Sequence, residues 1–373
     1  MNIPLVDLNR IYKKKEQEIT QAMKQVIEKS TFIQGPEVAL FEHAFATYCG
    51  KRFGVGVSSG TDALQLTIQA YNIKDSEIIT TAYTFVATVL AIKHTGNTPV
   101  FVDIDETGNI AVSEIERKIT KKTKALLPVH LYGKPANMTE ILALAKKYNL
   151  IVIEDCCQAH GAVCGEKIVP ISETGCFSFY PAKNLGCFGD GGFIATDNEE
   201  LYKKLCLLRE YGATQKYYYD GEDGFNSRLD TLQAAVLLVK LETLEKENEL
   251  RRTAAEYYLQ KLFPLCERQK IVTPKILASV KHVYHLFSIL VKERNRLQEF
   301  LKDRGIATGI HYPYPLHLQR MFAYLGYKEG DFPITERFSK ETLSLPLFPY
   351  ITVEEIDYVC SSIKDFYQTQ EKI

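Results

Sequence analysis

The sequence predicts an α/β protein with a mostly parallel, doubly wound sheet domain and a smaller C-terminal α/β domain. Two observations lead to this fold class. Runs of valine, isoleucine and leucine alternate with amphipathic segments along the first part of the chain, as is typical of parallel strands covered on both faces. The alternation stops near Asn226, where a long helical stretch begins, and 373 residues are enough for two hydrophobic cores.

The elements of the first domain follow from local patterns. Apolar residues three or four positions apart, such as Ile19, Met23 and Val26, predict a helix, and a short unbroken apolar run predicts a buried strand. Helices are expected at 15–30, after the Gly35-Pro36 turn within 31–50, and at 62–73, 84–96, 111–120 and 137–149. Strands are expected at 53–57, 77–81 and 99–105, within 123–133, and at 150–155.

The stretch 228–263 carries Leu229 and Val236 on one side, as expected for a single helix that leaves the sheet domain. We place the domain boundary within this helix, which divides the chain into a large domain, 1–240, and a smaller one, 241–373. The elements expected after it are a strand at 282–291, a helix at 294–305, a strand at 307–313 and a closing helix at 352–368.

The composition argues against several classes of partner. The chain has 45 Lys and Arg against 46 Asp and Glu and no basic stripe, so a nucleic-acid partner is not expected. The amino-terminal segment lacks the basic-then-apolar order of a signal peptide, and no apolar stretch approaches bilayer length. These features predict a cytoplasmic protein with no membrane partner.

Nine cysteines raise the question of a metal. Five of them lie close together, as they would in a metal-binding or iron–sulfur protein, but none has the C-x-x-C spacing of structural zinc. Because free cysteine is a small residue that buries readily, we expect packing and no metal. The five are Cys156, Cys157, Cys164, Cys176 and Cys187.

Two features of the predicted sheet suggest a ligand site. Asp155 ends the strand at 150–155, and ligands of such sheets bind beyond the carboxyl ends of the strands. Gly60 and Thr61 lie in a turn before a helix, where free backbone N–H groups favour a phosphate. Each feature has a structural alternative, since Asp155 could cap a helix and most such turns bind nothing.

Phe85 and Lys183 add two more features. Phe85 begins the next predicted helix and could be ordinary core or could stack on a planar ligand. Lys183 lies between a buried aromatic strand and a glycine-rich loop, where it is either solvated or, if buried, without its charge; lysine is the residue that forms imines with carbonyl cofactors. Pyridoxal phosphate (PLP) is the cofactor that needs an anion cradle, to which Ser178 can add, a stacking ring, a carboxylate and a lysine.

With these residues placed, the chain resembles the DegT/DnrJ family of PLP-dependent nucleotide-sugar aminotransferases over essentially its whole length. The resemblance implies the aspartate aminotransferase-like fold, which is PLP-dependent transferase fold type I. The segments that carry it are FIQGPEVALFEHAFATYCG, VSSGTDALQLTI, AYTFVATVLAI, PVFVDID, PVHLYGKPANM, IEDCCQAHGA, FSFYPAKNLGCFGDGG and GFNSRLDTLQAA.

The resemblance implies a role for each candidate residue. Lys183 would hold PLP covalently and then move the proton between the donor Cα atom and the cofactor. Asp155 would pair with the pyridine nitrogen, Gln158 would bond the ring hydroxyl, and Phe85 would stack on the ring. The expected active form is at least a homodimer, because one phosphate ligand would come from the opposite subunit. The phosphate ligands would be Gly60, Thr61, Ser178 and, from the opposite subunit, Asn226.

The implied reaction is transfer of an amino group from L-glutamate to a nucleotide-linked keto sugar, in the synthesis of amino sugars for polysaccharides. The lysine segment is most similar to members that act on 3-keto sugars, since members that aminate C4 often carry histidine at the position of Tyr180. His311 and Tyr312 would contact the sugar, with hinge packing as the alternative. The expected substrate is a dTDP-linked 3-keto-6-deoxyhexose; a UDP-linked 3-keto sugar such as a uronic acid, or a 4-keto sugar, is the alternative.

Two other functions compete with this one. Sugar 3-dehydratases of the same family use pyridoxamine phosphate and carry histidine in place of the lysine, so Lys183 argues against them. A PLP-containing transcription regulator would need a DNA-binding domain, and the first residues of the chain already follow the enzyme pattern. An aminotransferase is therefore the expected activity.

Overall fold

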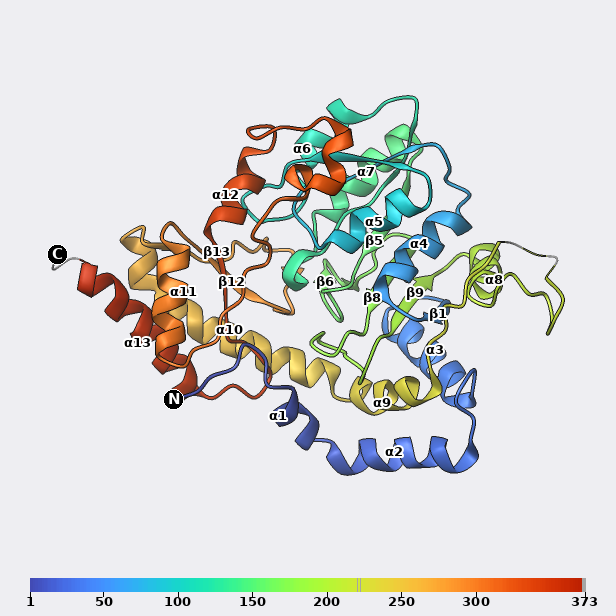
Figure 1. The fold of residues 1–373 in the computed structure, drawn as a ribbon, viewed down its shortest axis with the longest axis horizontal. Helices are drawn as coiled ribbons and strands as arrows, with labels where there is room; N and C mark the ends of the chain where they lie inside the picture. Colours follow the sequence, from blue (N-terminus) through green and yellow to red (C-terminus); the bar gives the residue numbers. More distant parts are fainter. Residues whose placement is uncertain (220, 222, 371–373) are drawn as a thin grey trace.

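The chain folds around a seven-stranded sheet in a computed structural model, which describes residues 1–219, 221 and 223–370 (Figure 1). Six strands run in one direction, whereas β9 runs antiparallel to both of its neighbours, β1 and β8. The mostly parallel sheet that the sequence predicts is confirmed. Its order is β1 (Phe53–Val57), β9 (Gly192–Thr196), β8 (Thr174–Ser178), β5 (Ile151–Asp155), β4 (Thr123–Leu126), β2 (Glu77–Thr81) and β3 (Thr98–Val102).

Helices cover both faces of this sheet (Figure 1). Cys176 of β8 packs on one set of helices and the next residue, Phe177, packs on the other, because successive side chains of a strand point to opposite faces. The helices on the Cys176 face are α4 (Gly60–Ala70), α5 (Val86–His94) and α8 (Glu199–Leu208). Those on the Phe177 face are α3 (Pro36–Tyr48) and α9 (Thr231–Leu241). A further cluster holds α6 (Val112–Ile115) and α7 (Met138–Tyr148).

A second hydrophobic core lies at the C-terminal side of the molecule (Figure 1). Tyr258 and Phe287, with ring centroids 4.9 Å apart, stack at its centre, and Ile3 joins it through a bridge with Ile306. None of the described helices is long and apolar enough to cross a bilayer. The main elements here are α10 (Leu244–Glu267), α11 (Arg294–Asp303), α13 (Val353–Gln370), β10 (Ile271–Val272), β12 (Phe287–Val291) and β13 (Thr342–Leu345).

Shorter elements complete the chain. Two helices precede α3, a small three-stranded sheet has the order β11-β6-β7, and α12 follows two 3-10 turns. The division at 240/241 falls at the junction of α9 and α10 and stays a prediction. These elements are α1 (Leu8–Lys13), α2 (Glu16–Lys29), β6 (Val163–Cys164), β7 (Lys167–Ile168), β11 (Val280–Lys281) and α12 (Pro333–Glu341), with 3-10 turns at Glu116–Lys118, Leu131–Gly133, Leu316–Leu318 and Arg320–Leu325.

Several predicted elements differ from the observed ones. The single helix expected at 228–263 is wrong, because the chain breaks at Glu242-Thr243 so that α9 packs under the sheet while α10 leads to the second core. The strand expected at 307–313 is also wrong: the segment makes only one bridge, from Gly309 to Ser344, and it ends in Pro313, which has no N–H to donate.

Two other predictions hold only in part. The strand expected at 282–291 starts at Phe287, because the preceding residues bond the 131–133 turn instead, with the N–H of Val283 on the carbonyl of Gly133 at 3.0 Å. The helix expected at 111–120 is a short helix followed by a 3-10 turn.

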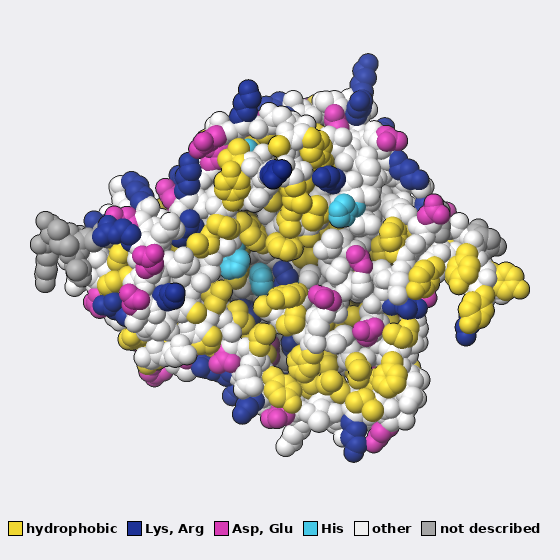
Figure 2. Space-filling view, viewed as in Figure 1, with side chains coloured by type: hydrophobic (Ala, Val, Ile, Leu, Met, Phe, Trp, Pro, Cys, Tyr) yellow, Lys and Arg dark blue, Asp and Glu magenta, His cyan; other side chains and the backbone are white. Residues whose placement is uncertain are grey.

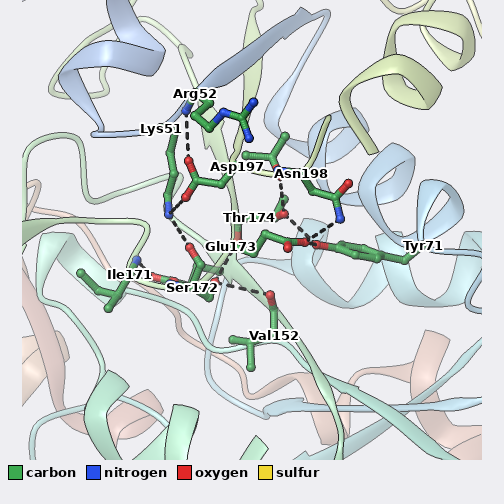
Figure 3. A network of polar contacts seen from close by, with 12 residues as sticks. Lys51, Arg52, Tyr71, Val152, Ile171, Ser172, Glu173, Thr174, Asp197 and Asn198 are labelled. Carbon is green, nitrogen blue, oxygen red and sulfur yellow. Dashed lines mark hydrogen bonds and ion pairs between the residues drawn. The ribbon is translucent and has the colours of Figure 1, made fainter. Parts of the chain in front are cut away.

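A polar network fixes the amino end of β8 (Figure 3). The ammonium of Lys51 donates to the carbonyl of Ser172 (2.6 Å) and to the carboxylate of Asp197 (3.0 Å), just beyond the end of the antiparallel neighbour β9. The hydroxyl of Tyr71 donates to Glu173 (2.8 Å), the residue before the strand. Polar contacts therefore close this edge of the sheet, and the candidate site residues lie at the opposite edge.

Candidate active site

The carboxyl ends of the parallel strands meet at one edge and carry the predicted residues there. Gly60 begins α4 beyond β1, Phe85 caps α5 beyond β2, and Asp155 ends β5. Ser178 ends β8, and Lys183 follows in the next loop. Figure 2 shows a hollow near the middle of one face, with histidine and Lys or Arg side chains inside it and hydrophobic side chains around it.

The first turn of α4 forms a narrow cradle. A Cβ atom on Gly60 would lie 2.7 Å from the Cβ of Ser178 and 2.8 Å from the Sγ of Cys157, so only glycine fits. Ser59 caps the helix by accepting the N–H of Asp62 at 3.1 Å, and the half-buried Thr61 lies in the same turn. Free N–H groups and the positive end of the helix make this cradle suitable for a phosphate.

Asp155 is held by two donors. The hydroxyl of Thr88 donates to its Oδ2 at 2.8 Å and the N–H of Cys157 donates to its Oδ1 at 3.1 Å, and the carboxylate is 5% exposed. Thr84 contacts Thr88 in turn, with 3.0 Å between their hydroxyl oxygens. Among the described residues, no basic side chain forms an ion pair with Asp155. The carboxylate is therefore fixed in orientation and has lone pairs left for a cationic N–H group.

Lys183 lies in the loop that follows β8. Its backbone N–H donates to the carbonyl of Tyr180 at 2.8 Å, and its half-buried side chain forms no ion pair with an acidic residue of the described chain. Burial lowers the pKa of the ammonium, and the neighbouring Cys157 and Asp155 side chains oppose this only in part. An amine that loses its proton more readily than a solvated lysine is the form that attacks a carbonyl carbon.

Gln158, Phe85 and Tyr312 lie together. The Nε2 of Gln158 donates to the hydroxyl of Tyr312 at 3.1 Å, and its Oε1 accepts the N–H of Tyr132 at 2.6 Å. Phe85 is 54% exposed, which is not the ordinary core position that the alternative predicted, and its ring centroid is 6.0 Å from that of Tyr312. An aromatic ring is thus available to a planar ligand at this edge.

The side chains of three other predicted residues, His311, Tyr180 and Asn226, make no hydrogen bond with Gln158, Phe85 or Tyr312. His311 bonds Ser344, with 2.9 Å between Nδ1 and Oγ, and burial and the charge of Lys183 lower its pKa to about 4. Tyr180 is 56% exposed; its N–H donates to the hydroxyl of Ser178 at 3.3 Å, and its side chain makes no hydrogen bond with a described residue. Asn226 is exposed, and no hydrogen bond of its side chain to a described residue is found.

Two tyrosines that were not among the predicted site residues hold the backbone of His311 and Tyr312, which come from the smaller domain. The hydroxyl of Tyr83 donates to the carbonyl of His311 at 2.8 Å and accepts the N–H of Tyr312 at 3.1 Å. The hydroxyl of Tyr132 donates to the same carbonyl, and its oxygen lies 3.1 Å from that of Tyr83. No sequence signal reports these bonds, because the partners lie 228, 229 and 179 positions apart.

One buried cluster has the side chains of a metal site. Ligand atoms of His130, Glu154 and Cys156 lie within 4.8 Å of one another. Hydrogen bonds already use the side chains of His130 and Glu154: Nε2 of His130 bonds Glu154 at 2.8 Å, and its Nδ1 accepts the N–H of Ala136 at 3.0 Å. Glu154 also accepts the N–H groups of residues 171 and 172. We interpret the cluster as a structural link between β5 and the following loop.

Known proteins match this chain over nearly its whole length. A model of the DegT/DnrJ/EryC1/StrS aminotransferase family matches residues 13–364. The "pleiotropic regulatory protein" of Geobacillus stearothermophilus is 44% identical over 99% of this chain and 99% of its own. The dTDP-3-amino-3,6-dideoxy-α-D-galactopyranose transaminase of Aneurinibacillus thermoaerophilus is 44% identical over 98% and 99%. The UDP-N-acetyl-3-dehydro-α-D-glucosamine 3-aminotransferase of Acidithiobacillus ferrooxidans is 40% identical over 97% of both chains.

Solved structures show the same agreement. DesV of S. venezuelae, in complex with a ketimine intermediate, superimposes with a TM-score of 0.95 at 39% identity and covers 98% of both chains. NtdA from Bacillus subtilis with bound cofactor PMP gives a TM-score of 0.91 at 34% identity, over 98% of this chain and 85% of that one. The fold is that of PLP-dependent aminotransferases, as the sequence predicts.

The residues at the edge of the sheet fit PLP. The cradle at Gly60, which a Cβ atom would fill, suits the phosphate, and the buried carboxylate of Asp155 suits the pyridinium nitrogen. Lys183 supplies an amine whose pKa burial lowers, and Phe85 supplies an exposed ring. Cys157 lies beside the phosphate cradle at Gly60, where it would contact the cofactor, whereas Cys156 packs in the core.

We expect the substitution Thr88→Val to weaken PLP binding about fivefold to tenfold, because the carboxylate of Asp155 loses one of its two fixed donors, a loss of about 1 kcal/mol. Thr88→Ser should restore most of the affinity. Titration of the apoprotein with PLP, followed by its absorbance, measures the effect.

Thr67 provides the matched control for this variant. It is a buried threonine of α4 whose hydroxyl donates to the carbonyl of Ala63 at 2.7 Å and lies 3.3 Å from the Sγ of Cys176. Thr67→Val should leave PLP affinity close to that of the wild type. Equal losses in the two valine variants would show that general destabilisation, and not the orientation of Asp155, governs binding.

Proposed function

Because the chain belongs to the DegT/DnrJ/EryC1/StrS aminotransferase family, we propose that it transfers an amino group from L-glutamate to C3 of a nucleotide-linked 3-keto sugar. It is a PLP-dependent aminotransferase, and we put a dTDP-linked 3-keto-6-deoxyhexose first as the substrate. The observation that carries this choice is the near full-length similarity to the dTDP-3-amino-3,6-dideoxy-α-D-galactopyranose transaminase. A UDP-linked 3-keto sugar is the second candidate, on the similarity to the UDP-sugar 3-aminotransferase.

Each candidate residue at the carboxyl ends of the strands has a role in this reaction. When bound, PLP supplies an electron sink for the negative charge that develops at the donor Cα atom. The Nζ of Lys183 takes the proton from that carbon and later returns a proton to the sugar carbon, a task that its lowered pKa favours. Asp155 keeps a proton on the pyridine nitrogen, while the first turn of α4 holds the phosphate. Phe85 excludes water from one face of the ring.

The sugar would lie between the two domains. Tyr180 is exposed at the start of the lysine loop, and His311 and Tyr312 come from the segment between α11 and α12. Tyr312 contacts both Gln158 and Phe85, which supports a place for it next to the cofactor. Tyr180 is the residue that we associate with amination at C3 rather than C4.

A panel assay tests the proposal directly. The purified enzyme is incubated with L-glutamate and, one at a time, dTDP- and UDP-linked 3-keto and 4-keto sugars, and amino-sugar nucleotides are detected by mass spectrometry. NMR of the product identifies the aminated carbon. The highest kcat/KM is expected for the dTDP-linked 3-keto sugar. Preference for a 4-keto sugar would contradict the regiochemistry, and preference for a UDP sugar would select the second candidate.

A cofactor-binding regulator is the competing class, and the name of one relative favours it. A regulator would bind DNA and would turn over none of the keto sugars. The panel assay and a gel-shift experiment therefore separate the two functions, since catalytic turnover without DNA binding is expected here.

We also propose that the active form is a homodimer in which Asn226 completes the partner's phosphate site. Asn226 is exposed, while its neighbour Ser227 anchors the backbone by donating to Asp62 at 2.8 Å. Exposed aromatic side chains before it suit a subunit contact, and Figure 2 shows hydrophobic side chains projecting beyond α8. They are Tyr211, Tyr217, Tyr218, Tyr219 and Phe225.

Subunit complementation tests this arrangement. A hybrid dimer of one Lys183→Ala subunit and one Asn226→Ala subunit contains one intact and one doubly defective site if the two residues of a site come from different subunits. It should then show about half of the wild-type kcat per dimer, although each parent homodimer is impaired. A hybrid as inactive as its parents would contradict the shared site, because both sites would then carry one defect.

A further inference from the structure

A row of three hydrogen-bonded polar side chains leads from β12 and β13 to His311. Ser288 of β12 and Ser344 of β13 face each other in the antiparallel pair, with 2.7 Å between their hydroxyl oxygens. The hydroxyl of Ser344 lies 2.9 Å from Nδ1 of His311. Ser344 is fully buried, and Ser288 is 8% exposed. Ser344 thus contacts His311 at Nδ1, and Ser288 contacts Ser344 in turn.

Only one arrangement of the hydroxyl hydrogens of Ser288 and Ser344 gives each of them an acceptor. Each serine carries one hydroxyl hydrogen. If Ser288 donates to Ser344 and Ser344 donates to Nδ1 of His311, both hydrogens are bonded and Nδ1 is an acceptor. In the reverse direction, the hydroxyl hydrogen of Ser288 has no acceptor among the described residues. Leaving a buried donor unpaired is costly, so the first arrangement is favoured.

The second ring nitrogen of His311 remains for a ligand. Burial and the positive charge of Lys183 keep the imidazole neutral at neutral pH, with one hydrogen on one nitrogen. If Nδ1 is the acceptor, that hydrogen is on Nε2, and Nε2 makes no hydrogen bond with any described residue. The half-buried ring is close enough to Lys183 for the charge of that residue to affect the pKa of the imidazole, and His311 directly precedes Tyr312, which contacts Gln158 and Phe85.

We propose that Ser288 and Ser344 fix His311 as the Nε2-protonated tautomer, so that the imidazole offers the sugar one hydrogen-bond donor and no acceptor. Such a donor recognises a keto or hydroxyl oxygen and offers nothing to an ammonium group. Ser344 is then a positioning residue for substrate recognition. The part of the proposal that concerns the sugar rests on the proposed function, whereas the tautomer is a property of the protein alone.

The tautomer can be measured without any substrate. Nitrogen NMR of the PLP-loaded enzyme labelled with ¹⁵N-histidine distinguishes a protonated from an unprotonated ring nitrogen, and the spectrum of His311→Gln identifies the signals of His311. We expect a protonated Nε2 and an unprotonated Nδ1. The opposite tautomer, or a mixture of both in the wild-type enzyme, would overturn the proposal.

Two serine variants test whether the hydrogen bonds are donated from Ser288 to Ser344 and from Ser344 to His311. Ser344→Ala removes the donor to Nδ1, and we expect a mixture of tautomers and a KM for the keto sugar raised about threefold to tenfold, with the glutamate half-reaction little changed. Ser288→Ala leaves the hydroxyl of Ser344 in place, so the tautomer and KM should stay as in the wild type. A tautomer change in Ser288→Ala equal to that in Ser344→Ala would contradict the direction.

The two proposals fail in different ways. If no keto sugar is turned over while His311 carries its proton on Nε2, the proposed function fails and the tautomer stands. If keto sugars are turned over but Nδ1 carries the proton, only the present proposal fails. Because the tautomer is measured in the wild-type enzyme once the signals of His311 are assigned, a serine variant that does not fold leaves the test intact.

Discussion

Replacement of Lys183 with alanine is expected to lower the rate of transamination at least about a thousandfold while PLP still binds. The loss is large because one amine both holds the cofactor and moves the proton, and general acid–base catalysis alone contributes up to about ten-thousandfold. The phosphate cradle at Gly60 and the carboxylate of Asp155 do not depend on this side chain, so binding should persist. Single-turnover kinetics with glutamate and an absorbance titration measure the two effects separately.

The chain offers matched controls for Lys183, since burial lowers the pKa of two other lysines as well. Burial brings the pKa of Lys134 to about 8, and its Nζ donates to the backbone carbonyls of Thr107 and Lys275. Burial also lowers the pKa of Lys240, whose Nζ donates to the carbonyl of Gly186.

Borohydride reduction followed by peptide mass spectrometry should attach PLP to Lys183 and to neither control, and Lys134→Met should retain turnover. Attachment at Lys134 or Lys240 would contradict the assignment of Lys183.

The sequence predicts well which residues lie at the carboxyl ends of the strands, because the pattern that identifies each strand is local. Asp155 and Gly60 each follow an apolar run that is typical of a parallel strand, and the carboxyl ends of parallel strands lie at one edge. Once the strands are placed, the residues after them must converge. The reversed strand β9 was not predicted, since its five residues follow the glycines of the lysine loop without a pattern of their own.

Contacts between distant segments could not be predicted in this way. Thr88 reaches Asp155 across 67 positions and Ser344 reaches His311 across 33, and no periodicity reports such pairs. The break between α9 and α10 falls at Glu242-Thr243, where neither glycine nor proline marks it. Tertiary packing decides these features, because each half of the predicted helix buries its apolar side in a different core.

Asp155→Asn is expected to lower kcat about a hundredfold with little change in fold, which corresponds to ~3 kcal/mol for a hydrogen bond to a charged group. Asparagine keeps the shape, since its carbonyl oxygen can still accept the N–H of Cys157 and its amide NH2 can donate to the hydroxyl oxygen of Thr88, but it cannot keep a proton on the pyridine nitrogen. Steady-state kinetics measure the loss, and circular dichroism checks the fold. Full activity in this variant would show that the charge of Asp155 is not needed.

Asp155→Ala allows a rescue experiment that isolates the charge. A PLP analogue methylated at the pyridine nitrogen carries a permanent positive charge, and the alanine variant has room for the methyl group that Asp155, held by Thr88 and Cys157, does not leave. The analogue should therefore raise the activity of Asp155→Ala above that with PLP and should be poorly used by the wild type. If PLP and the analogue serve the variant equally, then Asp155 acts by orienting the ring and not by holding the proton.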